Sequence, residues 1–295
     1  MPLTFTRTFR VRYYECDAYG HLNNANYLRY MQETAFDASA AAGYDMERYN
    51  QIGHHWLIRA TDIEYLRPLR YDDEVEVKTW VADFHRVRSR RVYEFRLSGT
   101  DDLVAQANTD WVYLESATGK PATIPQEMRE AFFPEGPPQQ ALTRQPFPTA
   151  PEPPPGVFKM RHRVAWQDID MVQHVNNAVY LEYVEECGMQ VIAAHGWPVQ
   201  RMTQEGFAII LRRHQIEYRL PSLLDEEIEI ATWASNVRRS TATRHYAIRR
   251  VNDGELLARI HTLGVWIDLA TGRPIRIPEW FIKDFAPNIV TDGHG

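Results

Sequence analysis

The sequence predicts an α+β fold that occurs twice in one chain, each copy being an antiparallel sheet with one long helix. Residues 9–125 align with residues 162–278 without a gap, and 41 of the 117 aligned pairs are identical. Each copy has one segment with apolar residues at the three- and four-residue spacing of a helix. Its other segments are rich in β-branched and aromatic residues and end at turn-forming residues, which is typical of strands.

The repeat is long enough to be a duplicated domain, because about 120 residues can close one hydrophobic core. Residues 126–161 lie between the copies and contain nine of the chain's 18 prolines. Proline fixes φ and lacks an N–H donor, so this stretch is expected to be an extended, semi-rigid connector. We therefore expect a first domain over residues 1–130, a linker over 131–158, a second domain over 159–285 and a tail over 286–295.

In the first copy the expected order is one strand, one helix and then three strands. Residues 4–14 show a rough alternation of β-branched and aromatic residues, which predicts a strand. Residues 26–42 have apolar side chains at helical spacing, and Gly43 ends this run. The segments 74–80, 90–97 and 104–114 are predicted strands.

The second copy repeats this order. Residues 163–166 echo the first strand, and Gly196 ends the helix as Gly43 does. The segments 227–233, 244–251 and 256–267 are predicted strands. Asn252-Asp-Gly-Glu255 predicts a hairpin turn between the last two, because Asp-Gly suits a turn with positive φ. The helix of each copy most simply covers one face of its sheet.

Composition excludes several classes of protein. The 44% hydrophobic and 24% charged fractions are ordinary for a soluble globular protein. The net charge of −6 argues against a general affinity for nucleic acid or for anionic membranes. No apolar run approaches the ~20 residues of a membrane span, and two cysteines make no disulfide framework. We expect a cytoplasmic protein.

The segment between the first strand and the helix gathers polar groups in both copies. It contains Asp17, His21, Asn23 and Asn24 in the first copy, and Asp170, His174, Asn176 and Asn177 in the second. The first turn of a helix presents free N–H groups and the positive end of the helix dipole to whatever lies in front of it. An oxygen that gains negative charge would be stabilised there, and a nearby carboxylate can act as base or nucleophile.

A plainer interpretation is that these residues only begin the helix. Asp and Asn are common N-caps, and a histidine at such a place is often a hydrogen-bonding strut. However, the pattern His-x-Asn-Asn-x-x-Tyr follows the aspartate in both copies, although about two thirds of the aligned positions differ. Capping alone would not require that whole set of residues.

These segments resemble the Asp-x-x-Gly-His-x-Asn-Asn-x-x-Tyr signature of the hotdog-fold thioesterases, in particular the 4-hydroxybenzoyl-CoA and acyl-CoA thioesterase group. The second copy is also similar to the acyl-ACP thioesterases, which themselves contain two hotdog domains. The resemblance covers both repeats. It implies a long helix wrapped by a curved antiparallel sheet in each copy, two copies paired as an intrachain pseudo-dimer with sites at their interface, and no metal or organic cofactor. It also implies that two such chains can pair into a homodimer.

The resemblance assigns roles to individual residues. The family's catalytic carboxylate falls on Asp17 and on Asp170, and its oxyanion donor falls on the backbone N–H of Asn24 and of Asn177. His21 and His174 match the motif histidine, which orients the site or helps to position water. Glu15 and Asp168 match an acidic position two residues earlier, where the side chain is either structural or raises the pKa of its neighbour.

The second copy departs from the signature at three places. Gln173 stands where the motif has glycine, and Val172 stands where plant-type acyl-ACP enzymes have a further asparagine. Pro221-Ser222 replaces their Glu-Cys pair. These departures weaken the similarity to acyl-ACP enzymes and leave it open whether both sites are active.

A basic cluster lies at the start of the same strand in each copy. It comprises Arg86, Arg88 and Arg91 in the first copy, and Arg239, Ser240 and Arg244 in the second. Arginine with serine or threonine can hold phosphate oxygens by charge-assisted hydrogen bonds, and in similar enzymes this region meets the nucleotide or phosphopantetheine arm. The alternative is a solvated strand rim paired with acidic neighbours.

Three functions follow from these observations. The leading one is a thioesterase that hydrolyses an acyl-CoA, or an acyl-ACP, to a free acid and a thiol. A non-catalytic module that binds or senses acyl-CoA is the alternative. A hotdog hydratase or dehydratase fits less well, because it uses a different Asp/His or Glu/His placement. The sequence does not specify the length or head group of the acyl chain.

Overall fold

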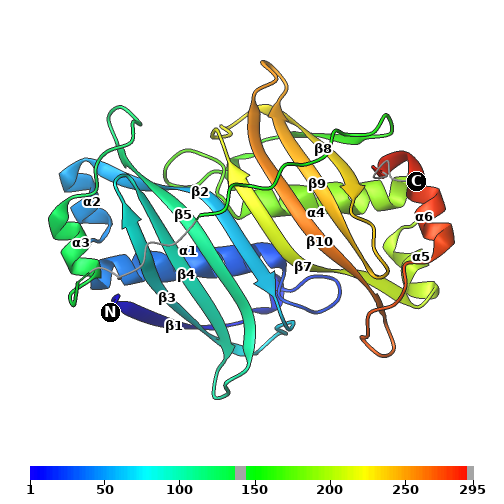
Figure 1. Cartoon of the computed structure of the whole chain (residues 1–295), viewed down its shortest axis with the longest axis horizontal. Helices are drawn as coiled ribbons and strands as arrows, with labels where there is room; N and C mark the ends of the chain where they lie inside the picture. The colour runs from blue at the N-terminus through cyan, green and yellow to red at the C-terminus, as the bar shows by residue number, and fades with distance from the viewer. Residues whose placement is uncertain (137–143, 291–295) are drawn as a thin grey trace. The chain divides into compact units, whose positions relative to one another are not determined.

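The computed structural model describes residues 1–136 and 144–290, which divide into two compact units, Met1–Pro146 and Phe147–Gly295. In the described part, each unit has five antiparallel strands and one long helix (Figure 1). The predicted α+β organisation with a duplicated unit is therefore confirmed.

The first unit has strand order β1-β3-β4-β5-β2. Its elements are β1 (Thr4–Arg10), the 3-10 turn η1 (Tyr13–Glu15), α1 (Asn24–Ala41), α2 (Met46–Ile52), β2 (His54–Tyr65), β3 (Glu74–His85), β4 (Arg88–Leu97), β5 (Leu103–Glu115) and α3 (Gln126–Phe132).

The second unit repeats this order as β6-β8-β9-β10-β7. Its elements are β6 (Phe158–Arg163), η2 (Trp166–Asp168), α4 (Val179–Ala194), α5 (Val199–Gln204), β7 (Phe207–Tyr218), β8 (Glu227–Ser235), β9 (Thr241–Arg250), β10 (Leu256–Asp268), α6 (Glu279–Phe285) and η3 (Ala286–Asn288).

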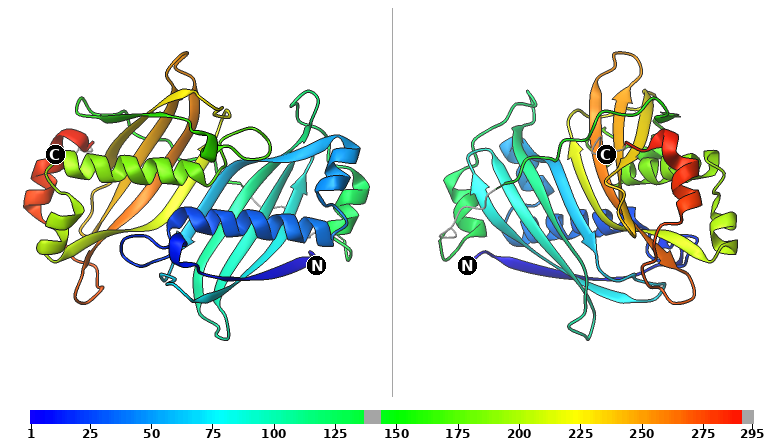
Figure 2. Two further views of the ribbon diagram at one scale, coloured as in Figure 1. Left: turned by 180° about the vertical axis from the view of Figure 1, so that it is seen from behind. Right: turned by 45° about the vertical axis from the view of Figure 1, so that its right-hand side comes forward.

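In each unit the long helix lies across one face of its own sheet (Figure 2). The sequence pattern explains this contact, because alternate residues of β3, including Val75, Val77 and Val81, are buried while Glu74 and Glu76 between them are exposed. On α1 the buried side chains recur at helical spacing. The core of each unit therefore lies between the helix and the inner face of the sheet.

The structure contains elements that the sequence analysis did not predict. The strands β2 and β7 are absent from the prediction, as are the short helices α2, α3, α5 and α6. The first strand ends at Arg10 rather than at residue 14, because Tyr13–Glu15 forms a 3-10 turn. The long helix α1 begins at Asn24, two residues earlier than expected.

Both units continue beyond the expected domain ends. Phe132 and Phe133 are buried in the core of the first unit, and Asn288 is fully buried in the second. Residues 137–143 of the expected linker and 291–295 of the expected tail lie outside the described residues. Among the helices that are described, none has the length and apolar character needed to cross a bilayer.

Candidate active sites

Asp17 organises the loop in front of α1. Its Oδ1 accepts hydrogen bonds from the backbone N–H of Tyr19 at 2.9 Å and of His21 at 3.0 Å. The backbone N–H of Asp17 donates to the carbonyl of His21 at 2.7 Å, which closes the loop. Asp17 itself is exposed, so its carboxylate is both held in place and accessible.

Asp170 organises the matching loop in front of α4. Its Oδ1 accepts from the N–H of Val172 at 3.0 Å, and its N–H donates to the carbonyl of His174 at 2.9 Å. Gln173 has a φ of 65°, close to the 75° of Gly20 at the same place in the first unit. The departure from glycine therefore leaves the loop conformation unchanged.

The helix start lies directly after each loop. Asn23 Oδ1 accepts from the N–H of Ala25 at 2.9 Å, and Asn176 Oδ1 accepts from that of Ala178 at 3.0 Å. In the second unit Ala178 already has helical dihedral angles, although α4 is assigned from Val179. The N–H groups of Asn24 and Asn177, which follow each capping residue, donate to no acceptor among the described residues. A hydrogen bond from either group to a ligand would therefore displace no acceptor in the described part of the chain.

Two tyrosines fix the peptide groups at these helix starts. Tyr65 OH donates to the carbonyl of Asn24 at 3.4 Å, and Tyr218 OH donates to that of Asn177 at 2.9 Å. Both tyrosines come from the strands that the sequence analysis did not predict. Both tyrosines end an Ile-Glu-Tyr triplet that occurs at residues 63–65 and again at residues 216–218. This repeat was the signal that could have identified them.

Glu15 and Asp168 are buried and support the loops. Glu15 is 8% exposed and accepts from Tyr30 OH at 2.6 Å, while Asp168 is 7% exposed and accepts from Tyr183 OH at 2.8 Å. Burial and these hydrogen bonds raise the pKa of both tyrosines. This geometry favours the structural interpretation of the two acidic residues.

The two motif histidines differ in their surroundings. Burial lowers the pKa of His21, and the charge of Asp17 opposes part of this shift. In the second unit, His174 Nδ1 is buried and has no hydrogen-bond partner in the described part of the chain. Both side chains are half-buried beside their loop aspartates.

The structure separates the predicted basic residues into two groups. Arg86, Arg88 and Arg239 are exposed around the start of β4 and of β9, with Ser240 half-buried beside them. Arg91 and Arg244 instead point into the interior. Arg91 is 6% exposed and Arg244 is half-buried. The six residues therefore do not form one exposed cluster, because side chains alternate across a strand and Arg91 and Arg244 point inward.

No group of three or more metal-ligating side chains is arranged to hold a metal ion in residues 1–136 and 144–290. The sequence analysis also missed a cavity inside the second unit, which is described below. The signal for this cavity was that small residues of the second copy align with large residues of the first, as Gly264 does with Trp111.

Comparison with known proteins identifies the family. A model of the thioesterase-like superfamily matches residues 11–132 and again residues 164–285. Among curated proteins, an acyl-[acyl-carrier-protein] hydrolase of Cuphea viscosissima is 26% identical over 193 residues, 62% of this chain and 47% of that protein. An acyl-CoA thioester hydrolase of Escherichia coli is 26% identical over 130 residues, 44% of this chain and 96% of that protein. The chain thus spans about half the length of the plant relatives that it matches.

A solved structure shows the same fold. The 12:0-ACP thioesterase from Umbellularia californica superposes with a TM-score of 0.72 and 20% identity, covering 88% of this chain and 93% of that one. The helix and curved sheet of each unit, repeated twice, match the hotdog fold that the motif implied. With a family model covering both repeats, this chain belongs to the thioesterase-like superfamily as a tandem of two hotdog units.

Proposed function

We propose that this chain hydrolyses an acyl thioester to a free acid and a thiol, with acyl-CoA as the first candidate substrate and acyl-ACP as the second. The observation that carries the proposal is the pairing, within one repeated segment, of an accessible carboxylate and an unused helix-start N–H group. Asp17 is paired in this way with Asn24, and Asp170 with Asn177. Family membership and the names of the relatives support the same reaction.

In the proposed reaction the carboxylate takes a proton from a water molecule as that water attacks the thioester carbonyl. The carbonyl oxygen gains negative charge and accepts a hydrogen bond from the helix-start N–H. The carbon–sulfur bond then breaks, and the sulfur leaves with the proton as the free thiol. Alternatively, the carboxylate attacks the carbonyl itself and the carbon–sulfur bond breaks, which gives a mixed anhydride and a thiolate. Water then hydrolyses the anhydride to the acid and the free aspartate, and the thiolate takes up the proton that this step releases.

Single turnover in water labelled with oxygen-18 tests for the nucleophilic route in which water attacks the aspartyl carbonyl. If the carboxylate acts as a base, the first turnover places the label in the product acid. If it acts as a nucleophile and water then attacks the aspartyl carbonyl, the label enters the aspartate and the first product acid remains unlabelled. Mass spectrometry of the released acid and of the loop peptides distinguishes the outcomes.

The exposed basic residues are proposed contacts for the phosphates of the carrier. Arg86, Arg88 and Arg239 can hold phosphate oxygens by charge-assisted hydrogen bonds, with Ser240 adding a hydroxyl. Arg91 and Arg244 are left out of this proposed phosphate site because Arg91 is buried and the half-buried Arg244 lies in the wall of an interior cavity. We further propose the cytoplasm as the place of action and a homodimer of whole chains as an assembly to be tested by light scattering.

The decisive experiment replaces Asp17 and Asp170 with asparagine, singly and together. Asparagine keeps an oxygen acceptor for the loop N–H groups, so each loop can retain its conformation while the charge is removed. The double variant should release no thiol from a panel of short, long and aromatic acyl-CoAs and one acyl-ACP. Each single variant reports whether its own site is active.

A matched control is Glu33→Gln, which removes an exposed carboxylate on α1 far along the helix from the loop. Its rate should equal that of the unchanged protein. Thiol release at the unchanged rate in the double variant would refute the proposed role of the two aspartates. Tight binding of acyl-CoA without turnover by the unchanged protein would favour a binding module instead.

A further inference from the structure

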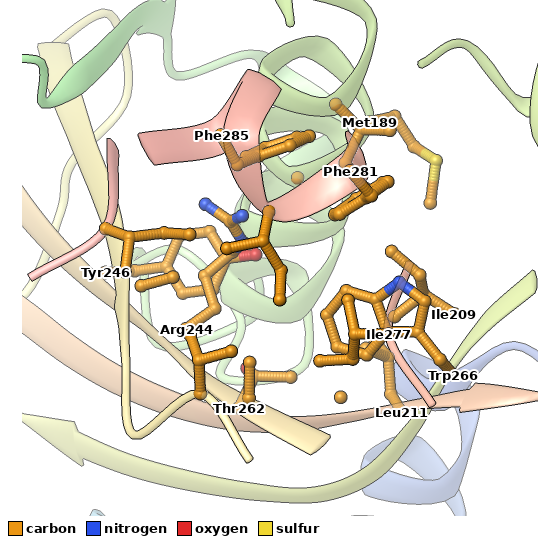
Figure 3. Close-up of a pocket in the computed structure, with 18 of the residues that line it drawn as sticks. Met189, Ile209, Leu211, Arg244, Tyr246, Thr262, Trp266, Ile277, Phe281 and Phe285 are labelled. Carbon is orange, nitrogen blue, oxygen red and sulfur yellow. The ribbon is translucent and has the colours of Figure 1, made fainter. Parts of the chain in front are cut away.

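The second unit contains a cavity of about 100 Å³ between α4, the inner face of its sheet and α6 (Figure 3). Most of its wall is apolar, with Ile209, Trp266 and Phe281 among the larger contributors. Gly264 in β10 adds no side chain to this wall. Met189 on α4 is also part of the wall and is 44% exposed, so the cavity reaches the surface of the unit at a flexible side chain.

Arg244 is the one cationic side chain of this wall among the described residues. Its Nη1 donates to Asn288 Oδ1 at 3.0 Å and reaches Thr232 Oγ1 at 3.5 Å, and the guanidinium carbon lies 5.8 Å from the centre of the Phe285 ring. Within the part of the chain that the structure describes, Nη2 and Nε donate no hydrogen bond and no carboxylate lies within 4.0 Å. Burial lowers the pKa of this arginine.

A second donor in the wall lacks a partner. Trp266 is 7% exposed, and its indole Nε1 is buried without a hydrogen-bond partner in residues 144–290. In Figure 3, Arg244 lies beside Phe285, and Trp266 lies beside Ile277 on the other side of the cavity. A buried neutral donor without an acceptor, such as this indole N–H, costs about 1–3 kcal/mol. An oxygen acceptor inside the cavity would remove this cost.

Glu185 on α4 also contributes to the wall. The cavity therefore has one positive and one negative side chain, and an oxygen acceptor is favoured only at the end occupied by Arg244. An ammonium group is disfavoured at that end for the same electrostatic reason. The remaining wall suits an aliphatic chain.

The first unit provides an internal comparison, because the same arginine occurs there with larger residues at three aligned positions. Arg91 lies 5.8 Å from the centre of the Phe132 ring and reaches Thr79 Oγ1 at 3.5 Å, as Arg244 does with Phe285 and Thr232. The cavity positions, however, have larger residues: Trp111 replaces Gly264, Trp56 replaces Ile209 and Phe84 replaces Val237. Larger side chains therefore stand in the first unit at positions that line the cavity of the second.

We propose that this cavity is a binding site for the end of an aliphatic chain that carries a carboxylate or another oxygen acceptor, with Arg244 holding the oxygen. An apolar cavity of about 150 Å³ accommodates benzene, so about 100 Å³ holds on the order of four carbon atoms, and the rest of a longer chain extends toward Met189. This proposal concerns binding only, so it does not depend on whether the chain hydrolyses thioesters.

Two sources can supply such a ligand. One is a free carboxylic acid, whose carboxylate meets Arg244 while its tail fills the apolar wall. The other is the acyl group of a thioester whose far end carries an oxygen function. Both place an oxygen acceptor beside the same guanidinium, and they differ in whether the thioester end is needed.

The test measures binding by isothermal titration calorimetry, with hexanoate as probe and hexylammonium as the chain-matched cation. The unchanged protein should bind hexanoate more tightly than hexylammonium. Arg244→Gln should weaken hexanoate binding by about 10- to 100-fold, the effect of losing a hydrogen bond to a charged group. Arg91→Gln is the matched control, because it removes the equivalent arginine from the first unit, and it should bind hexanoate like the unchanged protein.

A second variant avoids any change of charge. Val237→Phe copies the residue of the first unit into the cavity and should abolish hexanoate binding while leaving Arg244 in place. Near-ultraviolet circular dichroism checks that each variant is folded. Equal affinity for hexanoate in the unchanged protein and in both variants would overturn the proposal, as would equal affinity for hexanoate and hexylammonium.

The source of the ligand is distinguished by hydrolysis rates of hexanoyl-CoA and of adipoyl-CoA, which has a carboxylate at its far end. A preference for adipoyl-CoA that disappears in Arg244→Gln identifies the far end of the substrate as the ligand. Hexanoate binding without this preference identifies a free acid, and either result supports the site. If neither ester is hydrolysed, the proposed function fails, while the calorimetric result still decides the binding site.

Discussion

At positions 20 and 173 the backbone has the same left-handed conformation, with glycine in one unit and glutamine in the other. A residue with a Cβ atom loses about 1–2 kcal/mol in this conformation relative to glycine. We therefore predict that Gln173→Gly raises the free energy of unfolding by about 1 kcal/mol, measured by urea titration. Gly20→Gln is the reciprocal variant and should lower it by about the same amount. A loss of stability in Gln173→Gly would show that the glutamine side chain makes stabilising contacts.

The side chain of Asp17 stabilises its loop in addition to its proposed chemical role. It accepts two backbone hydrogen bonds, which alanine cannot replace and asparagine can. Asp17→Ala should therefore lower the free energy of unfolding by about 1–2 kcal/mol, and Asp17→Asn should change it by less than about 0.5 kcal/mol. Urea unfolding of the two variants provides the measurement. Equal stabilities would mean that the loop is held by its backbone alone.

Sequence reasoning identified the loop residues because they are contiguous and occur in both copies. It grouped Arg91 and Arg244 with the other residues of the basic cluster because it considered charge without the alternation of the strand. Ser89, Arg91 and Tyr93 are all buried, and these alternate positions face the interior. The direction of one side chain along a strand depends on register, which a short charged run does not reveal.

At the level of single elements, the start of each long helix depends on an asparagine cap. Asn23 and Asn176 each accept one N–H from the first turn. Replacing either with alanine should cost about 1 kcal/mol of stability and increase hydrogen exchange in the first turn of that helix. Asn23→Asp should keep the cap and serve as the control. Unchanged exchange at the start of α1 in Asn23→Ala would contradict this role of the cap.

The long helices and three strands of each unit could be predicted because their periodicity is strong. The strands β2 and β7 escaped prediction because only their second halves alternate clearly. In β2 the buried residues Thr61, Ile63 and Tyr65 alternate, while residues 54–60 are neither fully buried nor regularly patterned. The short helices have six or seven residues, which is too few for a helical period to be distinguished from a loop.

At the scale of the whole molecule, the two units should differ in their response to acid. Three histidines of the second unit are buried, and burial lowers their pKa values to about 3 for His214, about 4 for His245 and about 3 for His261. The aligned residues of the first unit are Thr61, Val92 and Asn108, which do not titrate.

The sign of the pH effect follows from proton binding. Below about pH 6.5 the unfolded chain binds a proton at each of these histidines, whereas the folded unit stays neutral there until about pH 4. Acidification from pH 6.5 to 4 should therefore destabilise the second unit, by up to about 1.4 kcal/mol per pH unit for each histidine. Hydrogen exchange at pH 7 and pH 5 should show a greater loss of protection in the second unit. A greater loss in the first unit would contradict the prediction.

The contrast between Trp111 and Gly264 has a consequence for how such a protein can evolve. When two identical subunits associate, a single codon specifies the residue at a given position in both subunits. A bulky residue that fills the interior of one subunit therefore fills the interior of the other as well. Fusing the copies gives each position two codons. One unit can then keep a filled interior while the other acquires a cavity for a ligand. Each substitution affects the packing of one unit only.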